Sequence, residues 1–270
     1  DIAEAMWLPW NIDLSKVSNV GSVKSLTIGV EGAGAAGTLY IDDIRLYPQT
    51  PAYVVPTQPD TANLVAQYTF DGNLNDSAGS HHGTALGNAA VGTDPTRGQV
   101  LSLDGAGDAV DVAYSADLNP EAFTASFWAY PDAAGTGHRS PLTSRDDSPQ
   151  RGYIFYIEPG NAWQFWTGNG AGWNATTGPT AKFDEWTHVA ATFENEQRKL
   201  YINGRLVGEG TAPLSLNTQR PLRIGGGATE GAGNYFFPGK IDEVRVYNRV
   251  LTPEEVAGQA GQTTPLPASF

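Results

Sequence analysis

The segment between residues 153 and 174 is dense in aromatic rings. These rings are Tyr153, Phe155, Tyr156, Trp163, Phe165, Trp166 and Trp173. Aromatic rings stack on the flat C–H faces of sugars, while amide and charged side chains bind the hydroxyl groups. Alternation along a strand would place Tyr156 opposite Tyr153 and Phe155, and Trp166 opposite Trp163 and Phe165. One set of rings must then be core, and the other set would line the surface of a sheet.

We therefore predict a sugar-contacting surface in this part of the chain. Its candidate residues are Trp173, Trp166, Tyr156, Asn174, Asn169 and Arg151. Trp173 stands among Gly and Asn residues in an expected loop, so it is the ring expected to be most exposed. The run from Arg139 to Arg151, with Arg145 inside it, is interpreted as a polar loop that either rims a site or is merely solvated. The alternative is that both ring sets are buried between two packed sheets.

Nucleophilic and phosphate chemistry finds no matching motif. The chain contains no Cys, which excludes disulfides and thiol nucleophiles. No Gly-x-Ser-x-Gly sequence is present, and the glycines at 225–227 lack the Lys-Ser/Thr of a phosphate loop. His81 and His82 are a weak metal pair, because adjacent strand residues point in opposite directions. His188 alternates with expected core positions and is interpreted as a packed histidine.

The charge balance excludes two classes of partner. Sixteen Lys and Arg residues face 29 Asp and Glu residues, a net charge of −13. Nucleic acid and anionic membrane surfaces both require clustered basic residues, which are absent. No stretch approaches the roughly 18–20 apolar residues of a membrane span. The acidic excess fits either solubility or cation binding.

The elements that must position these residues fall into three zones. Residues 1–48 hold two strand-like runs, at 25–30 and 38–47, and are expected to be a C-terminal fragment of an upstream β-sandwich or a docking hairpin. Residues 49–62 contain three prolines, with a fourth directly before them at Pro48, and are interpreted as an interdomain linker. Residues 63–260 alternate short strands with turns, and 261–270 form a tail.

The third zone predicts an all-β domain with antiparallel strands. The expected strands are 64–70, 100–103, 109–112, 123–130, 153–158, 163–167, 186–194, 199–202, 205–208, 222–224 and 239–248. Asn203-Gly204 is the strongest hairpin signal, because a type I′ turn needs positive φ at both central residues. A short helix is expected after Thr252, which would cap it, with Pro253 at its first position. No helical period separates the strands, which argues against a parallel α/β sheet.

Five stretches in this zone resemble, in order, the motifs of bacterial laminin-G-like domains of the concanavalin A-like lectin/glucanase type. They are 68–76 (YTFDGNLND), 103–110 (LDGAGDAV), 123–131 (FTASFWAYP), 186–204 (beginning WTHVAATF and ending LYING) and 237–252 (FPGKIDEVRVYNRVLT). The resemblance covers about 200 residues and implies an antiparallel jelly-roll β-sandwich. It also implies that Trp128 and Trp186 belong to the core. It says little about the ligand, since such folds host many functions.

The resemblance further implies a calcium ion where the first and last strands meet. Calcium takes six to eight oxygen ligands. The candidate ligands are Asp71, Asp242, Asn73 and Asp76, with Gly72 offering its carbonyl. The alternative is that the 71–73 segment is only a turn whose side chains bond the backbone, and that Asp242 pairs with an arginine.

Related glycosidases of this fold carry a Glu-x-Asp-x-x-Glu motif, which is absent here. We therefore expect a non-catalytic, lectin-like module that binds a polysaccharide or glycan and is stabilised by calcium. It is expected to be a monomeric part of a larger secreted, extracellular protein with further domains upstream. Two alternatives stay open, an adhesion or spacer module and a glycoside hydrolase or lyase of another type.

Overall fold

The computed structural model describes Ser25, Thr27, Ile28 and residues 53–132, 134–230 and 234–267. The chain divides into two units, at 1–52 and 53–270. The upstream fragment predicted over residues 1–48 lies, apart from those three residues, outside the described part.

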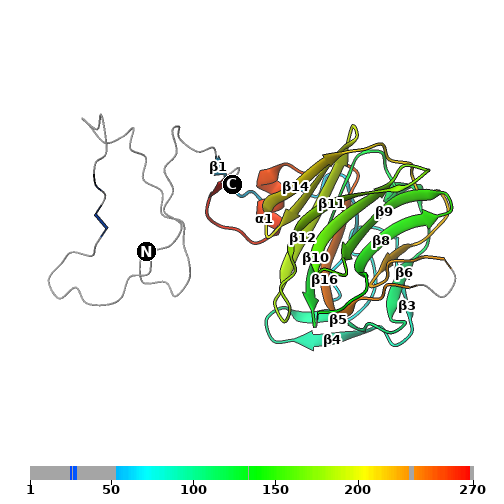
Figure 1. Cartoon of the computed structure of the whole chain (residues 1–270). Helices are drawn as coiled ribbons and strands as arrows, with labels where there is room; N and C mark the ends of the chain where they lie inside the picture. The colour runs from blue at the N-terminus through cyan, green and yellow to red at the C-terminus, as the bar shows by residue number, and fades with distance from the viewer. Residues whose placement is uncertain (1–24, 26, 29–52, 133, 231–233, 268–270) are drawn as a thin grey trace. The chain divides into compact units, whose positions relative to one another are not determined.

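Two antiparallel sheets form a β-sandwich, which confirms the predicted all-β class (Figure 1). One sheet has seven strands, in the order β11 (Trp173–Thr180), β10 (Ala162–Gly168), β9 (Gln150–Ile157), β8 (Arg139–Asp147), β15 (Leu222–Ile224), β6 (Ala109–Val112) and β3 (Gly83–Leu86). The other has eight strands: β14 (Arg205–Thr211), β13 (Gln197–Ile202), β12 (Thr187–Glu194), β7 (Phe123–Pro131), β16 (Pro238–Tyr247), β5 (Gly98–Asp104) and β4 (Ala90–Asp94), with β2 (Leu64–Tyr68) also paired to β16.

The core lies between the sheets and is rich in phenylalanine. Phe127 of β7 meets Phe155 of β9 edge to face, with ring centroids 5.0 Å apart. Phe123 stacks on Phe193 of β12 at 5.9 Å, and Trp163 of β10 is 1% exposed. Every second residue of these strands points inward, which is why the hydrophobic alternation in the sequence locates the strands.

Strand β16 is shared by three neighbours. It pairs along its whole length with β7, along its first part with β5, and along its second part with β2. The register shifts between Asp242 and Arg245, and Glu243 has a φ of 51°. This bulge marks the point where one edge of β16 changes partner, as bulges do when a strand must bend.

The chain ends of the unit meet near a short helix. Helix α1 (Pro253–Gln259) begins with the predicted Thr252 cap, and Glu255 completes a capping box. Thr57 donates its backbone N–H to the Glu254 carbonyl at 2.9 Å. Beyond it, β1 (Tyr53–Val54) pairs with β17 (Leu266–Pro267), close together in Figure 1.

Within the segment 49–62, which was interpreted as a linker, β1 pairs with β17 of the expected tail. Three predictions about these elements were wrong. The expected polar loop 139–151 is the β8–β9 hairpin, and the expected loop around Trp173 is the start of β11. Trp128 and Trp186 are half-buried and lie outside the core. On β7, Phe127 and Ala129, each 0% exposed, take the inward positions on either side of Trp128.

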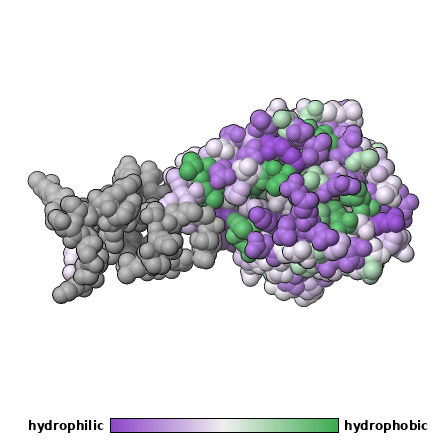
Figure 2. All heavy atoms as spheres, turned by 90° about the horizontal axis from the view of Figure 1, so that it is seen from above, coloured by the Kyte–Doolittle hydropathy of each residue, from purple (hydrophilic) through white to green (hydrophobic). Residues whose placement is uncertain are grey.

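The face of the second unit seen in Figure 2 mixes purple, hydrophilic residues with pale residues of intermediate hydropathy, and separate green, hydrophobic patches lie between them. In the described part of the chain, no helix is long and apolar enough to span a membrane.

Candidate functional site

An aromatic cluster occupies the outer face of the seven-stranded sheet. It consists of His138, Tyr156, Trp166 and Tyr235, and we call it the outer ring patch. Trp166 on β10 meets Tyr156 on β9 at 5.4 Å and His138 at 5.7 Å between ring centroids, both nearly perpendicular. Tyr235 lies 5.8 Å from Tyr156 and contributes a ring from the segment between β15 and β16. Edge-to-face contacts of this kind hold rings in fixed orientations.

The rings of the patch differ in their exposure. Tyr156 is only 3% exposed, and its hydroxyl donates a hydrogen bond to the Gly227 carbonyl at 3.4 Å. It therefore supports the other rings from below. Trp166, His138 and Tyr235 are half-buried and keep part of each ring at the surface. Trp166 donates its Nε1–H to Gln164 Oε1 at 2.8 Å, which orients the indole.

Trp173, the first residue of β11, contacts charged side chains. Trp173, Asp147, Arg145 and Glu230 are called the Trp173 group below. Trp173 Nε1 donates to Asp147 Oδ1 at 3.3 Å, and the Arg145 guanidinium lies 5.7 Å from the Trp173 ring. Arg145 is 8% exposed at its side chain and pairs with Glu230 at 3.0 Å. Trp173 and Trp166 share one face of adjacent strands, because Trp173 pairs with Gly168 and Trp166 with Ala175. The site thus combines partly exposed rings with carboxylates whose oxygens accept hydrogen bonds.

The other three predicted contacts lie elsewhere. Asn169 makes the β10–β11 turn, accepting backbone N–H bonds from Ala171 and Gly172 at 3.0 and 2.8 Å. Asn174 alternates with Trp173 and pairs with Thr167, which is 0% exposed, and its Nδ2 is buried. Arg151 lies 3.5 Å from the Thr218 hydroxyl. None of the three contacts the outer ring patch in the described contacts.

Sequence reasoning missed His138, Tyr235 and Glu230. Each comes from a connecting segment whose path over the sheet leaves no periodic signal in the sequence. Arg145 and Asp147 belong to the run interpreted as a polar loop that either rims a site or is merely solvated, and they lie on strand β8. Burial, opposed by the nearby Glu158 carboxylate, lowers the pKa of His138. Its imidazole is therefore neutral at neutral pH and offers a hydrogen-bond donor and an acceptor.

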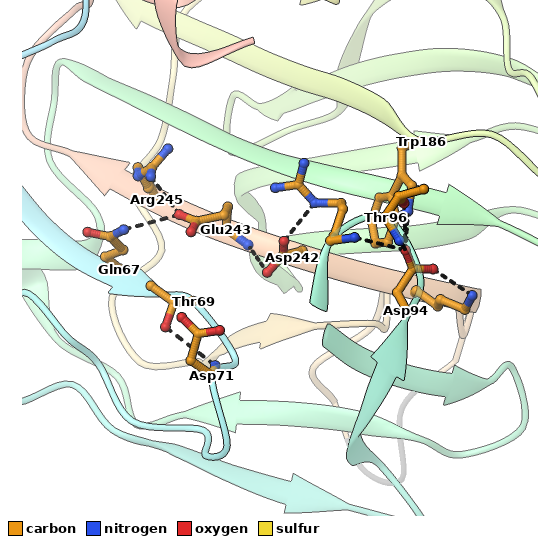
Figure 3. Close-up of polar contacts among 11 residues, drawn as sticks. Gln67, Thr69, Asp71, Asp94, Thr96, Trp186, Asp242, Glu243 and Arg245 are labelled. Carbon is orange, nitrogen blue, oxygen red and sulfur yellow. Dashed lines mark hydrogen bonds and ion pairs between the residues drawn. The ribbon is translucent and has the colours of Figure 1, made fainter. Parts of the chain in front are cut away.

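The predicted calcium ligands are mostly bound to protein donors. Asp76 accepts backbone N–H bonds from Gln67, Ala78 and His81 at 2.9–3.0 Å. Asp242 accepts from Arg97 Nε at 2.7 Å and from its neighbour's N–H at 2.9 Å, as drawn in Figure 3.

The three other predicted ligands, Asp71, Gly72 and Asn73, lie in the turn after β2. Asn73 Oδ1 accepts from Asn75 N–H at 2.8 Å, in a turn made by Gly72 with a φ of 86°. Of the three predicted carboxylate ligands, only the exposed Asp71 side chain has no hydrogen-bond or ion-pair partner among the described contacts. Among the described residues, no three His, Asp or Glu side chains are grouped so as to hold a metal ion. Calcium binding at these five residues stays a prediction.

Residues 104–257, more than half of the chain, match the family model for the concanavalin A-like lectin/glucanase superfamily. The chain belongs to this superfamily. The matched residues run from β5 through α1 and include the outer ring patch and the Trp173 group. The jelly-roll sandwich implied by the sequence motifs is thereby confirmed.

Solved structures of the superfamily's fold are similar over most of the second unit. Domain 4 of AbnA, an extracellular arabinanase from Geobacillus stearothermophilus solved with arabinotriose, is 24% identical with a TM-score of 0.58; 73% of this chain and 98% of that chain are covered. The binding domain of Paraclostridial Mosquitocidal Protein 1 is 17% identical with a TM-score of 0.60. That match covers 74% of this chain and 52% of the other.

The third similar structure belongs to a longer protein. Trypanosoma rangeli sialidase in complex with sialic acid is 17% identical with a TM-score of 0.60; the match covers 77% of this chain and 35% of that chain. No curated protein matches the sequence. At these identities the similarity establishes the fold.

Proposed function

We propose that this protein is a non-catalytic carbohydrate-binding module that holds a glycan against the outer face of its seven-stranded sheet. The observation that carries the proposal is the placement of Trp166 and Trp173, both half-buried, on one face of adjacent strands. Two indoles placed diagonally on neighbouring strands offer consecutive surfaces for stacking. Indole rings bind the C–H faces of pyranoses and furanoses.

Polar groups for sugar hydroxyls surround these rings. Asp147 is 51% and Glu230 29% exposed at the side chain. Gln164 lies beside Trp166 on the same strand. Carboxylate and amide side chains at the edge of a stacking ring fix the orientation of a sugar. The acids leave the site without excess positive charge, which favours neutral sugars over sulfated or carboxylated ones.

Two structural neighbours supply a general reason to test sugars. AbnA domain 4 was solved with arabinotriose and the sialidase with sialic acid. The surroundings of this chain's own rings favour the first kind of ligand, because no unpaired cation lies among the described contacts at the Trp173 group. Calcium dependence and secretion remain predictions from the sequence.

The proposal is tested with a glycan array followed by calorimetry on the glycans that bind. Trp166→Ala and Trp173→Ala are each expected to weaken binding by at least about tenfold, since stacking rings dominate such contacts. Tyr114→Ala is the matched control, because Tyr114 is 38% exposed and lies outside the site.

Three results would contradict the proposal. They are no glycan bound by the wild type, equal loss in the control, and loss only where the melting temperature also falls. Trp166→Phe separates the last case, because it keeps a ring packed on Tyr156. Absence of glycan binding would favour an adhesion or spacer module.

A further inference from the structure

A hollow of about 370 Å³ lies at one end of the sandwich. It is formed by the connection before β7, the β12–β13 turn and the segment that follows β14. Its lining residues are Glu121, Ala122, Phe193, Glu194, Asn195, Glu196, Pro213, Leu214 and Leu216. None of them belongs to the outer ring patch or to the Trp173 group, so this hollow is independent of the proposed glycan site.

The chemistry of the hollow is divided between its wall and its rim. The wall is aliphatic, from Leu214, Leu216, Pro213 and Ala122, while Phe193 is 4% exposed and has almost no free ring face. The rim carries Glu121, Glu194 and Glu196, all exposed, and the lining contains no Lys or Arg. Among the described contacts, none of these carboxylates has a hydrogen-bond or ion-pair partner.

We propose that this hollow is a docking site for a basic peptide segment, which inserts a lysine or arginine side chain. Long cationic side chains bury their methylene stem along apolar surface and keep the charged head at its edge. The aliphatic wall matches the stem, and the three carboxylates match the head, to which a guanidinium can bind in bidentate fashion. A sugar fits less well, because the wall presents no exposed aromatic ring for stacking.

Glu196, which supplies one of the rim carboxylates, has a backbone conformation that is unfavourable for a residue with a side chain. Asn195 and Glu196 have φ angles of 49° and 65° and form the β12–β13 turn. The next hairpin uses the same conformation with Asn203 and Gly204, at 49° and 79°. A type I′ turn favours glycine at its second central position. Replacing Glu196 with glycine therefore removes a rim charge and relaxes the turn at the same time.

The test measures binding of hexalysine and hexaarginine peptides by calorimetry at low and at physiological salt. Glu196→Gln and Glu196→Gly are expected to weaken binding at least fivefold, with the glycine variant melting at a higher temperature than wild type. Leu216→Ser should weaken binding too, since it removes part of the aliphatic wall. Glu209→Gln is the control, because Glu209 is exposed on β14 and does not line the hollow.

Weaker binding in the Glu196 and Leu216 variants, with the control unchanged, would support the proposal. An equal loss in Glu209→Gln would overturn it, because the peptides would then respond only to the net charge of −13. Absence of binding to either peptide would overturn it as well. Binding of chitosan oligomers, lost in Glu196→Gln while neither peptide binds, would assign the hollow to an amino sugar instead.

Discussion

His188 shows what burial does to a single ionisable group. It lies on the eight-stranded sheet at 1% exposure, with its ring 5.3 Å from that of Trp128. Its Nδ1 is buried without a hydrogen-bond partner among the described residues. Burial, reinforced by the positive charges of Arg245 and Arg97, lowers its pKa to about 3. The folded protein therefore holds this imidazole in its neutral form.

We expect His188 to contribute to acid denaturation. Its folded pKa lies below the unfolded value of about 6.5, so its contribution is complete above pH 6.5 and is lost as the pH falls towards 3. His188→Phe should flatten the fall in the free energy of unfolding between pH 6.5 and 4, measured by urea denaturation. His81→Gln, a half-buried histidine in a connecting segment, serves as the control. An unchanged slope in His188→Phe would contradict this prediction.

The sequence predicted where aromatic residues gather at the surface better than it predicted which individual rings are buried in the core. The ring-rich segment did yield Trp166 and Trp173 at one surface. The motif resemblance, however, placed Trp128 and Trp186 in the core, and they are half-buried outside it. Arg97 lies 4.4 Å from the Trp128 ring and 5.3 Å from that of Trp186, and covers both. A tryptophan on a strand can thus be largely covered from outside by a cation that no local pattern reveals.

At the scale of elements, Asp94 joins the β4–β5 turn to strand β16 and to the segment directly before β12. Its Oδ1 accepts from the Thr96 N–H and hydroxyl at 2.9 and 2.6 Å, and from Trp186 Nε1 at 3.2 Å. Its Oδ2 accepts from Lys240 Nζ at 2.9 Å (Figure 3). Burial alone would raise the pKa of Asp94, but these hydrogen bonds outweigh it and lower the pKa well below its usual value.

Asp94→Asn is expected to lower the free energy of unfolding by about 2 kcal/mol at pH 7, because charge-assisted hydrogen bonds are lost. The folded pKa is depressed, so the contribution is full above about pH 4 and disappears as the pH falls further. The difference between wild type and variant should narrow below pH 4 in urea titrations. Asp104→Asn, in an exposed turn, should cost less than about 1 kcal/mol. Equal losses in both variants would refute the assigned role.

Strands with a regular inward apolar alternation were predictable from the sequence. Strands whose alternation is interrupted by polar residues, such as β8 and β11, were not. β6 and β15 have the bounds expected from the sequence. β8 resembled a polar loop because Arg145 and Asp146 interrupt its alternation, yet both are buried by the segment after β15 and by residues 217–220. β11 lacks a continuous apolar face because it forms the edge of its sheet. These tertiary contacts override local pattern.

At the scale of the whole molecule, calcium binding is the prediction that most needs measurement. If calcium binds the folded state alone, it raises the melting temperature by mass action. The sequence-based expectation is a higher melting temperature in several millimolar calcium than in EDTA, above the roughly millimolar affinity of weak extracellular sites. Asp71→Ala should abolish this difference, and Asp117→Ala, exposed on the turn η2 (Ala116–Leu118), should not. Identical melting temperatures in calcium and EDTA would contradict the expectation.

The pairing of β1 with β17 has a mechanical consequence. Tyr53 faces Pro267 and Val54 faces Leu266, so the outgoing chain ends leave from the same side of this short pair. Leu64 of β2 likewise faces Tyr247 at the end of β16. Tension applied through both ends would break the hydrogen bonds of these pairs one after another, rather than shear whole strands past each other. Stretching would therefore peel the first and last strands away before the sheet that carries Trp166 and Trp173 bears any load.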